Sequence, residues 1–345
     1  MALLSLADAV ELLEGVRRGH LDLDRLPTYP MLVVDLDSGD QRLAERVVPE
    51  TGWPIVIVGV GSASSTPPAR ADVLLTESSD PPAPWVLVTE GIDKALLDLQ
   101  HTLAGCPQAG ATLVQVLRSN ENATVGTALA IESLAYATLQ GGDEHRAWLE
   151  GLNRPSPDLD DAPSVVLERE GSLLHVTLDR PSRRNAYSSK MRDELIEALK
   201  LAAADESISR VDLRGNGPNF CSGGDLAEFG TVTDTASAHW IRMQRSAGWW
   251  LHHVGAKTAV RVHGGCVGAG VELPGFAASV EAAAGATFAL PEVKMGLIPG
   301  AGGTASVPRR IGRQRTAWLA LTGRTLDAET ALGWGLVDRL SRGAD

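Results

Sequence analysis

The stretch that decides the fold runs from Val262 to Gly303 and reads VHGGCVGAGVELPGFAASVEAAAGATFALPEVKMGLIPGAGG. Two glutamates in it, Glu272 and Glu292, stand among apolar residues and glycines. Burying a carboxylate is costly unless it is paired, hydrogen-bonded or protonated, so acids placed in this way are candidates for acid–base chemistry. The small residues at 264–270 let backbone N–H groups approach a ligand closely, and such a turn before a helix can hold a developing oxyanion.

A second turn rich in small residues lies upstream at 220–226, with the sequence FCSGGDL. It follows the run 210–214, whose alternation predicts a strand, and the turn residues GNGP at 215–218. A single glycine pair often serves only as a tight corner. Two such turns about 45 residues apart, followed by two glutamates in apolar surroundings, indicate a catalytic site much more specifically.

These motifs resemble the crotonase, or enoyl-CoA hydratase/isomerase, superfamily over residues 165–340. The matching motifs occur in the order of the family, and they are RPSRRNA at 180–186, NFCSGGDL at 219–226, GAGVEL at 268–273, LPEV at 290–293 and GLIPGAGGT at 296–304. The resemblance implies an acyl-CoA thioester substrate whose carbonyl oxygen accepts hydrogen bonds from the backbone N–H groups of Gly224 and Ala269. It also implies a homo-oligomer and a place in fatty acid metabolism.

In hydratases of this family, two glutamates activate the water that adds across the 2,3 double bond, whereas isomerases generally rely on the second glutamate alone. Because this chain has both Glu272 and Glu292, hydration of a 2-enoyl-CoA is the favoured reaction. Coenzyme A enters as part of the substrate, and neither a separate cofactor nor a metal is expected. The residues expected to contact substrate or CoA are Arg183, Arg184, Ala186, Ser222, Asp225 and Gly268. The two arginines could equally be solvated loop charges.

The chain departs from the family pattern in two places. Hydratases usually carry an aspartate six residues after the first glutamate, and here that position is Ala278. Pro274 and Gly275 stand where a helix should continue, so the helix starts close to Gly270 or is kinked. These departures leave two alternatives open: another acyl-CoA reaction of the superfamily, such as isomerisation or hydrolysis, and a catalytically weak binding or assembly protein.

Composition and charge indicate a globular protein and argue against binding to nucleic acids and against a membrane span. The 345 residues are 44% hydrophobic and 21% charged, as in ordinary globular proteins. The net charge of −12 argues against nonspecific nucleic-acid binding, which needs a basic surface. The sequence contains no run of about 18 apolar residues, so it predicts no membrane span. Its first residues lack the basic region of a secretory signal. The three cysteines show no metal spacing, so a reducing cytoplasm is expected.

The fold class predicted is α/β: a crotonase-like ββα spiral core preceded by a smaller, degenerate α/β domain with a helical cap. Segment 153–163, rich in proline and aspartate, is the predicted linker between domains 1–152 and 164–345. Within the second domain we expect a hairpin over 165–178 and helices over 189–204 and 235–253. The large side chains of the last helix are expected to pack in the core rather than to line an acyl pocket; they are Trp240, Met243, Trp249 and Trp250.

The first domain carries no catalytic cluster. Short apolar runs predict strands at 31–36, 55–58, 73–75, 86–88 and 111–117, with a helix at 93–104. The glycine- and serine-rich run 59–65 is expected to be a plain loop. Residues 124–150 resemble the C-terminal helices of ordinary crotonases, so we expect a rearranged, non-catalytic cap whose apolar face includes Leu129, Leu134, Tyr136 and Trp148. Chance similarity of a helix rich in alanine and leucine is the alternative.

Overall fold

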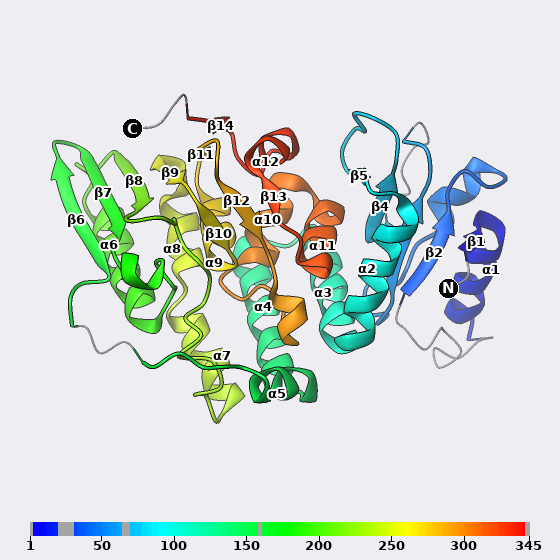
Figure 1. The fold of residues 1–345 in the computed structure, drawn as a ribbon, viewed down its shortest axis with the longest axis horizontal. Helices are drawn as coiled ribbons and strands as arrows, with labels where there is room; N and C mark the ends of the chain where they lie inside the picture. Colours follow the sequence, from blue (N-terminus) through cyan, green and yellow to red (C-terminus); the bar gives the residue numbers. More distant parts are fainter. Residues whose placement is uncertain (1–2, 20–30, 64–69, 158–160, 342–345) are drawn as a thin grey trace.

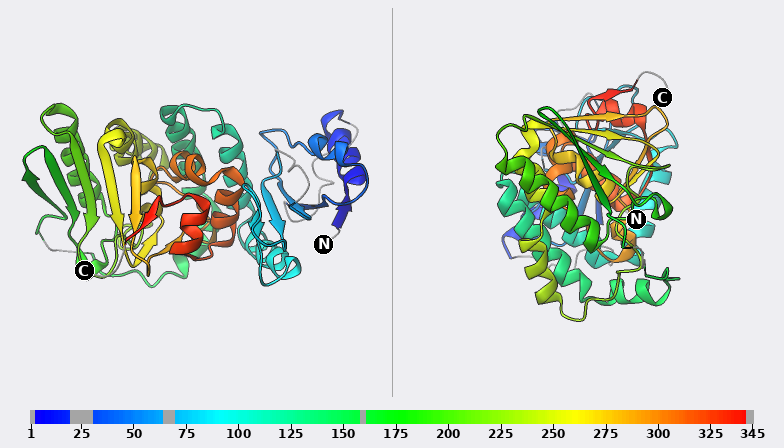
Figure 2. Two further views of the ribbon diagram at one scale, coloured as in Figure 1. Left: turned by 90° about the horizontal axis from the view of Figure 1, so that it is seen from above. Right: turned by 90° about the vertical axis from the view of Figure 1, so that its left-hand side faces the viewer.

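A computed structural model describes residues 3–19, 31–63, 70–157 and 161–341 of the chain. Figures 1 and 2 show two sheets at opposite ends of an elongated molecule, with helices packed between them. No helix in the described ranges is long and apolar enough to cross a bilayer. The predicted loop 59–65 and the predicted linker 153–163 each lie partly outside the described residues.

The N-terminal sheet has five parallel strands that are neighbours in chain order. They are β1 (Leu3–Ser5), β2 (Met31–Asp35), β3 (Val56–Val60), β4 (Val73–Thr76) and β5 (Val86–Leu87). The last four correspond to apolar runs predicted as strands. Because successive side chains point to opposite faces, Leu32 and Ile57 pack against helix α1 (Leu6–Arg17), while Val33 and Val58 join the main hydrophobic core. Both faces of the sheet are therefore covered.

Four helices follow this sheet: α2 (Ile92–Gly105), α3 (Pro107–Asn120), α4 (Val125–Gln140) and α5 (Asp143–Glu150). The prediction of a strand at 111–117 is wrong, because this run lies inside α3. Helix α3 is buried on most of its circumference, so its apolar residues show no helical period that would distinguish the run from a buried strand. Pro107 occupies the first turn of the helix, where its missing N–H costs nothing.

The second half forms a spiral in which the chain adds strands to two sheets in turn. The six-stranded sheet has the order β14-β11-β9-β8-β7-β6 and the three-stranded sheet the order β10-β12-β13. Strands β9 and β11 are parallel neighbours in the large sheet, and the strands that follow them, β10 and β12, are parallel neighbours in the small one. This repeat is the ββα spiral predicted from the sequence.

The predicted hairpin over 165–178, strand over 210–214 and helix over 189–204 agree closely with the structure. The strands are β6 (Val165–Glu170), β7 (Leu173–Leu178), β8 (Arg210–Gly215), β9 (Thr258–Val262), β10 (Gly265–Val267), β11 (Ser279–Ala282), β12 (Thr287–Ala289), β13 (Leu326–Asp327) and β14 (Arg339–Leu340). The helices are α6 (Ser189–Ala204), α7 (Thr235–Gln244), α8 (Ala247–Val254), α9 (Ala269–Glu272), α10 (Gly303–Ile311), α11 (Arg313–Thr322) and α12 (Ala328–Trp334). The hairpin β6–β7 turns at Gly171, whose φ of 59° favours glycine.

The helix expected over 235–253 is two helices, α7 and α8. The expectation that its large side chains pack in the core is wrong for three of the four, because Trp240, Met243 and Trp249 are 65%, 40% and 44% exposed. Helix α7 contacts α4 and buries only Ala238, so its larger apolar residues face away from the core. Only Trp250 packs, partly buried, against the core.

One hydrophobic core extends across both halves of the chain. Helix α11 packs against β4, α2 and α3, and α10 packs against α3 and α4. The same cluster of buried side chains therefore includes residues from the N-terminal sheet and from the spiral. Leu129 is buried as expected of the cap, but Leu134 is 55% exposed, so its expected place on the covered face is wrong. Tyr136 and Trp148 are half-buried.

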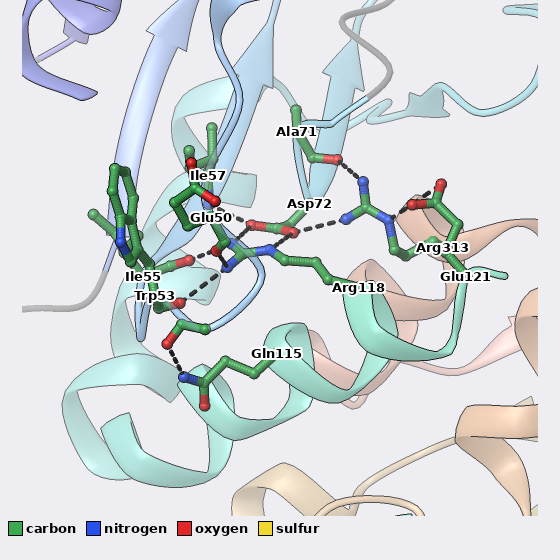
Figure 3. Close-up of polar contacts among 11 residues, drawn as sticks. Glu50, Trp53, Ile55, Ile57, Ala71, Asp72, Gln115, Arg118, Glu121 and Arg313 are labelled. Carbon is green, nitrogen blue, oxygen red and sulfur yellow. Dashed lines mark hydrogen bonds and ion pairs between the residues drawn. The ribbon is translucent and has the colours of Figure 1, made fainter. Parts of the chain in front are cut away.

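A buried ion cluster also joins the two halves (Figure 3). The Asp72 carboxylate is fully buried and accepts hydrogen bonds from Arg118 Nε at 2.9 Å and Arg313 Nη1 at 2.7 Å. It also accepts the backbone N–H of Ile57 at 2.8 Å. Arg118 lies on α3 and Arg313 begins α11, so a single carboxylate connects the N-terminal sheet to one helix from each half.

Candidate active site

The two glycine-rich turns lie side by side. Phe220 N donates to His263 O at 2.9 Å, and Val267 N donates to Cys221 O at 3.0 Å, so the two segments are held together by backbone hydrogen bonds. The second segment contains the short strand β10 as well as the expected turn. Gly224 in the first turn and Ala269 in the second line the same cavity, which measures about 220 Å³.

The cavity between the turns receives residues from both halves of the chain. It is lined by Tyr136, Gln140, Tyr187, Arg192, Gly224, Asp225, Glu228, Phe229, Arg242, Ala269, Glu272, Glu292, Gly300 and Ala301. Both predicted catalytic glutamates and both predicted oxyanion donors are therefore brought together. Among the described residues, neither the Gly224 N–H nor the Ala269 N–H has a backbone acceptor. Both donors remain available to a ligand.

Gly268 is needed for its conformation and for space. Its φ and ψ are 50° and −115°, a combination that residues with a side chain rarely adopt. A Cβ at this position would lie 2.5 Å from Glu292 Oε1 and therefore could not fit without displacing that carboxyl. Gly268 is thus the residue that lets Glu292 approach the second turn.

Glu272 is the last residue of α9 and is 2% exposed. Its Oε2 accepts the backbone N–H groups of Ala301 at 2.7 Å and Gly303 at 2.8 Å. Burial raises the pKa of Glu272 to about 7, although the two amides favour the charged form. Helix α9 stops at Glu272, and a 3-10 turn begins at Pro274. The unusual proline therefore ends the helix rather than kinking it.

Glu292 opens a 3-10 turn, Glu292–Met295, and its carboxyl group lies close to Gly268. Its Oε2 is out of contact with solvent and has no hydrogen-bond partner among the described residues. Burial and the nearby Glu272 carboxylate raise its pKa well above the usual range. Glu292 is therefore not a solvated surface acid, and burial favours its protonated form.

The structure places a third glutamate, Glu132 of α4, in this region, and it was not among the residues predicted from the sequence. It is 2% exposed, and its carboxylate accepts three hydrogen bonds: Gly302 N at 2.7 Å, Thr304 N at 2.8 Å and Thr304 Oγ1 at 2.7 Å. The backbone amides of one segment thus donate alternately to the two carboxylates. Glu272 accepts amides 301 and 303, and Glu132 accepts amides 302 and 304. Burial, and then the charge of Glu272, raise the pKa of Glu132 to about 8. An acid inside the apolar run ALAIESLAY was the signal available in the sequence.

Polar side chains of α4 and α7 also line the cavity, which the sequence did not indicate either. Arg242 of α7 lies over the Tyr136 ring, with its guanidinium carbon 4.6 Å from the ring centroid. Its Nε and Nη1 lie 3.3 Å from Ser133 Oγ and Gln140 Oε1 respectively. Burial lowers the pKa of Arg242 and raises that of Tyr136.

A second cavity of about 410 Å³ shares Asp225 and Glu228 with the first and is lined by residues of the 157–190 segment, including Arg180 and Lys190. Asp225, an expected substrate contact, forms a buried ion pair with Arg180 at 3.0 Å. The other expected contacts line neither of these two cavities; they are Arg183, Arg184, Ala186, Ser222 and Gly268. Arg183 donates to the backbone of Ser156, and Arg184 is exposed.

Comparisons with known proteins show what the second half of the chain is similar to. Residues 168–343 match the enoyl-CoA hydratase/isomerase family. A 2,3-dehydroadipyl-CoA hydratase of Escherichia coli is 34% identical over 179 residues, which cover 50% of this chain and 67% of that protein. An enoyl-CoA isomerase/hydratase of Mycosarcoma maydis is 35% identical over 183 residues, covering 50% and 66%. A 1,2-epoxyphenylacetyl-CoA isomerase of Escherichia coli is 35% identical over 178 residues, covering 50% and 68%. The chain spans about two thirds of the length of these relatives, and the resemblance read from its motifs is confirmed.

Proposed function

The chain belongs to the enoyl-CoA hydratase/isomerase family, and from this premise we propose that it adds water across the 2,3 double bond of a 2-enoyl-CoA thioester. The observation that carries the proposal is the pair Glu272 and Glu292 on one cavity, beside two turns with available N–H donors. The relatives' names differ between hydratase and isomerase, so similarity alone does not select the reaction.

In the proposed mechanism the thioester oxygen accepts hydrogen bonds from the N–H groups of Gly224 and Ala269. These donors stabilise the enolate-like state most, because negative charge grows on that oxygen as the reaction proceeds. Backbone donors in a closed site need no reorganisation during the reaction. Removing one donor of this kind typically costs about 10²–10³-fold in turnover.

The two glutamates then divide the proton transfers. Glu272, whose charged form is favoured by two amides, accepts a proton from water while the water oxygen bonds to C3. The electron pair of the double bond moves onto the thioester oxygen and returns as C2 takes a proton from Glu292, whose protonated form burial favours. Glu272 ends protonated and Glu292 ionised, and exchange of one proton resets the pair.

Isomerisation is the second candidate. Glu292 has a buried oxygen without a partner, so it alone could carry a proton from one carbon of the acyl chain to another. The same Gly224 and Ala269 donors would stabilise the dienolate in that reaction. A binding protein without catalysis is less well supported, because three buried carboxyl groups with raised pKa values are costly and are typical of catalytic sites.

The test is turnover of a panel of 2-enoyl-CoA and 3-enoyl-CoA thioesters by the wild type and by Glu272→Gln and Glu292→Gln variants. For a hydratase, each variant should lose about 10²-fold or more, the scale of general acid–base catalysis. Loss in Glu292→Gln alone, with turnover of 3-enoyl-CoA, would select isomerisation. Glu194→Gln is the matched control, because Glu194 accepts two backbone N–H groups outside the cavity. Unchanged turnover in both active-site variants would refute the proposal.

A further inference from the structure

The catalytic cavity has two ends of different character. One end shares Asp225 and Glu228 with the cavity formed by the 157–190 segment. The other end shares Tyr187, Arg192 and Arg242, together with Gly300 and Ala301, with a third cavity of about 130 Å³. The cavity that contains Glu272 and Glu292 therefore lies between an end near Arg180 and Lys190 and an end near Arg192 and Arg242.

The third cavity is lined by three arginines and a single carboxylate. The arginines are Arg192, Arg242 and Arg245, and the carboxylate is Glu132. Both oxygens of Glu132 already accept the donors of Gly302 and Thr304. Arg192 and Arg245 both pair with Asp193, at 2.9 Å and 3.5 Å.

Arg242 differs from the other two arginines. Among the described residues it has no carboxylate within 4 Å, and its hydrogen bonds go to neutral atoms. These are Ser133 Oγ, Ser133 O and Gln140 Oε1, at 3.3–3.5 Å, at the long end of the hydrogen-bond range. A half-buried guanidinium with no carboxylate within 4 Å is costly, and its five donors in a fork match a carboxylate.

We infer that this end of the site binds an ionised carboxylate at the far end of the acyl chain, with Arg242 as the principal contact. The substrate class is then the CoA monothioester of a dicarboxylic acid rather than of a simple fatty acid. The inference rests on the proposed function, because it assumes that the thioester lies between Gly224 and Ala269 with the acyl chain running toward Arg242.

Two other roles for Arg242 make different predictions. The guanidinium could balance the charge of the buried glutamates, or it could hold a phosphate of CoA. In either case its removal would affect carboxylated and uncarboxylated acyl-CoA substrates equally, because both substrates carry the same CoA and meet the same glutamates. Discrimination between the two acyl ends is therefore the property to measure.

The experiment compares 2-enoyl-CoA thioesters of five, six and eight carbons, each with and without a terminal carboxylate. We expect the wild type to have the higher kcat/KM for the carboxylated member of at least one pair. In Arg242→Met that preference should fall by about 10- to 100-fold, the scale of one charge-assisted hydrogen bond. Arg242→Lys should retain part of it, because the charge remains while the fork is lost. Arg210→Met, on an exposed arginine outside these cavities, controls for loss of a positive charge.

A binding measurement separates this inference from the proposed reaction. Saturated acyl-CoA thioesters of the same lengths cannot be hydrated, so their affinities by calorimetry report on recognition alone. A carboxylate preference that disappears in Arg242→Met supports the inference even if no hydration is observed. Equal affinity for both acyl ends, or an equal loss for both in Arg242→Met, overturns it, and hydration of the uncarboxylated probes would then leave the proposed function standing.

Discussion

The backbone amides of residues 301–304 donate alternately to Glu272 and Glu132, so Glu132→Gln is an informative perturbation. Glutamine has the shape of glutamate but only one acceptor oxygen, whereas Glu132 accepts three donors. If the amide oxygen keeps the two donors of Thr304, the new NH₂ group faces the N–H of Gly302. Two donors then oppose each other in a buried site, which costs about 1–3 kcal/mol.

The same change should also lower turnover, because Glu272 depends on the same segment. Its Oε2 is held by amides 301 and 303, which lie on either side of the amide that loses its acceptor. A displacement of about 1 Å at a reacting group can cost about 10²-fold. We therefore expect kcat to fall by about 10- to 100-fold while KM changes less, since Glu132 does not contact the thioester donors.

The assays are denaturant unfolding and steady-state kinetics on the same preparations. Glu194→Gln is the matched control, because Glu194 also accepts two backbone N–H groups, at 2.6 and 2.9 Å, but lies outside the cavity. It should lose stability without losing kcat. Full kcat per folded molecule in Glu132→Gln would refute the view that this carboxylate positions Glu272.

Two further predictions concern buried charge. Asp72→Asn should lower the free energy of unfolding by about 3–5 kcal/mol in denaturant titrations, because Arg118 and Arg313 lose their buried counter-ion. Asp143→Asn, which removes an exposed pair with Arg146, should cost about 0–1 kcal/mol. The pKa values of Glu272 and Glu132 are raised from 4.5 to about 7 and about 8, so the folded state binds more protons than the unfolded state across this range. The melting temperature should therefore fall as pH rises from about 5 to about 8. In Glu272→Gln and in Glu132→Gln the melting temperature should depend less on pH, and an unchanged dependence would contradict this linkage.

The parts of the site that could be predicted are those encoded locally. Glu272 and Glu292 stand in short motifs whose glycines are required by the backbone itself, as the φ of 50° at Gly268 shows. Gly224 and Ala269 follow from the same motifs, because a turn that exposes N–H groups is a property of a few consecutive residues. For the same reason the hairpin over 165–178 and the strand over 210–214 were located nearly to the residue.

The parts that could not be predicted depend on contacts between distant segments. Arg242 lies on a helix whose sequence indicates only packing. Glu132 interrupts an apolar run, but its partners are mostly backbone amides that any residue could supply. The error at 111–117 has a related cause, because a helix buried on most sides loses the periodicity that identifies it. Trp240 of α7 and Trp249 of α8 were misplaced because the sequence does not state which side of a helix meets its neighbour.

Segments that are far apart along the chain contribute to the same cavity. Helix α4 precedes the spiral in sequence, yet it supplies Tyr136 and Gln140 to the cavity and Glu132 to the segment that holds Glu272. Without α4, amides 302 and 304 would lose their acceptor, and without Asp72 the guanidinium of Arg313 would lose its buried carboxylate. The first loss affects the turn that leads into α10 and the start of that helix, and the second affects the start of α11. Both helices also form part of the common core. The second half of the chain therefore contains the two glutamates of the proposed reaction, while the position of Glu272 is maintained by the first half.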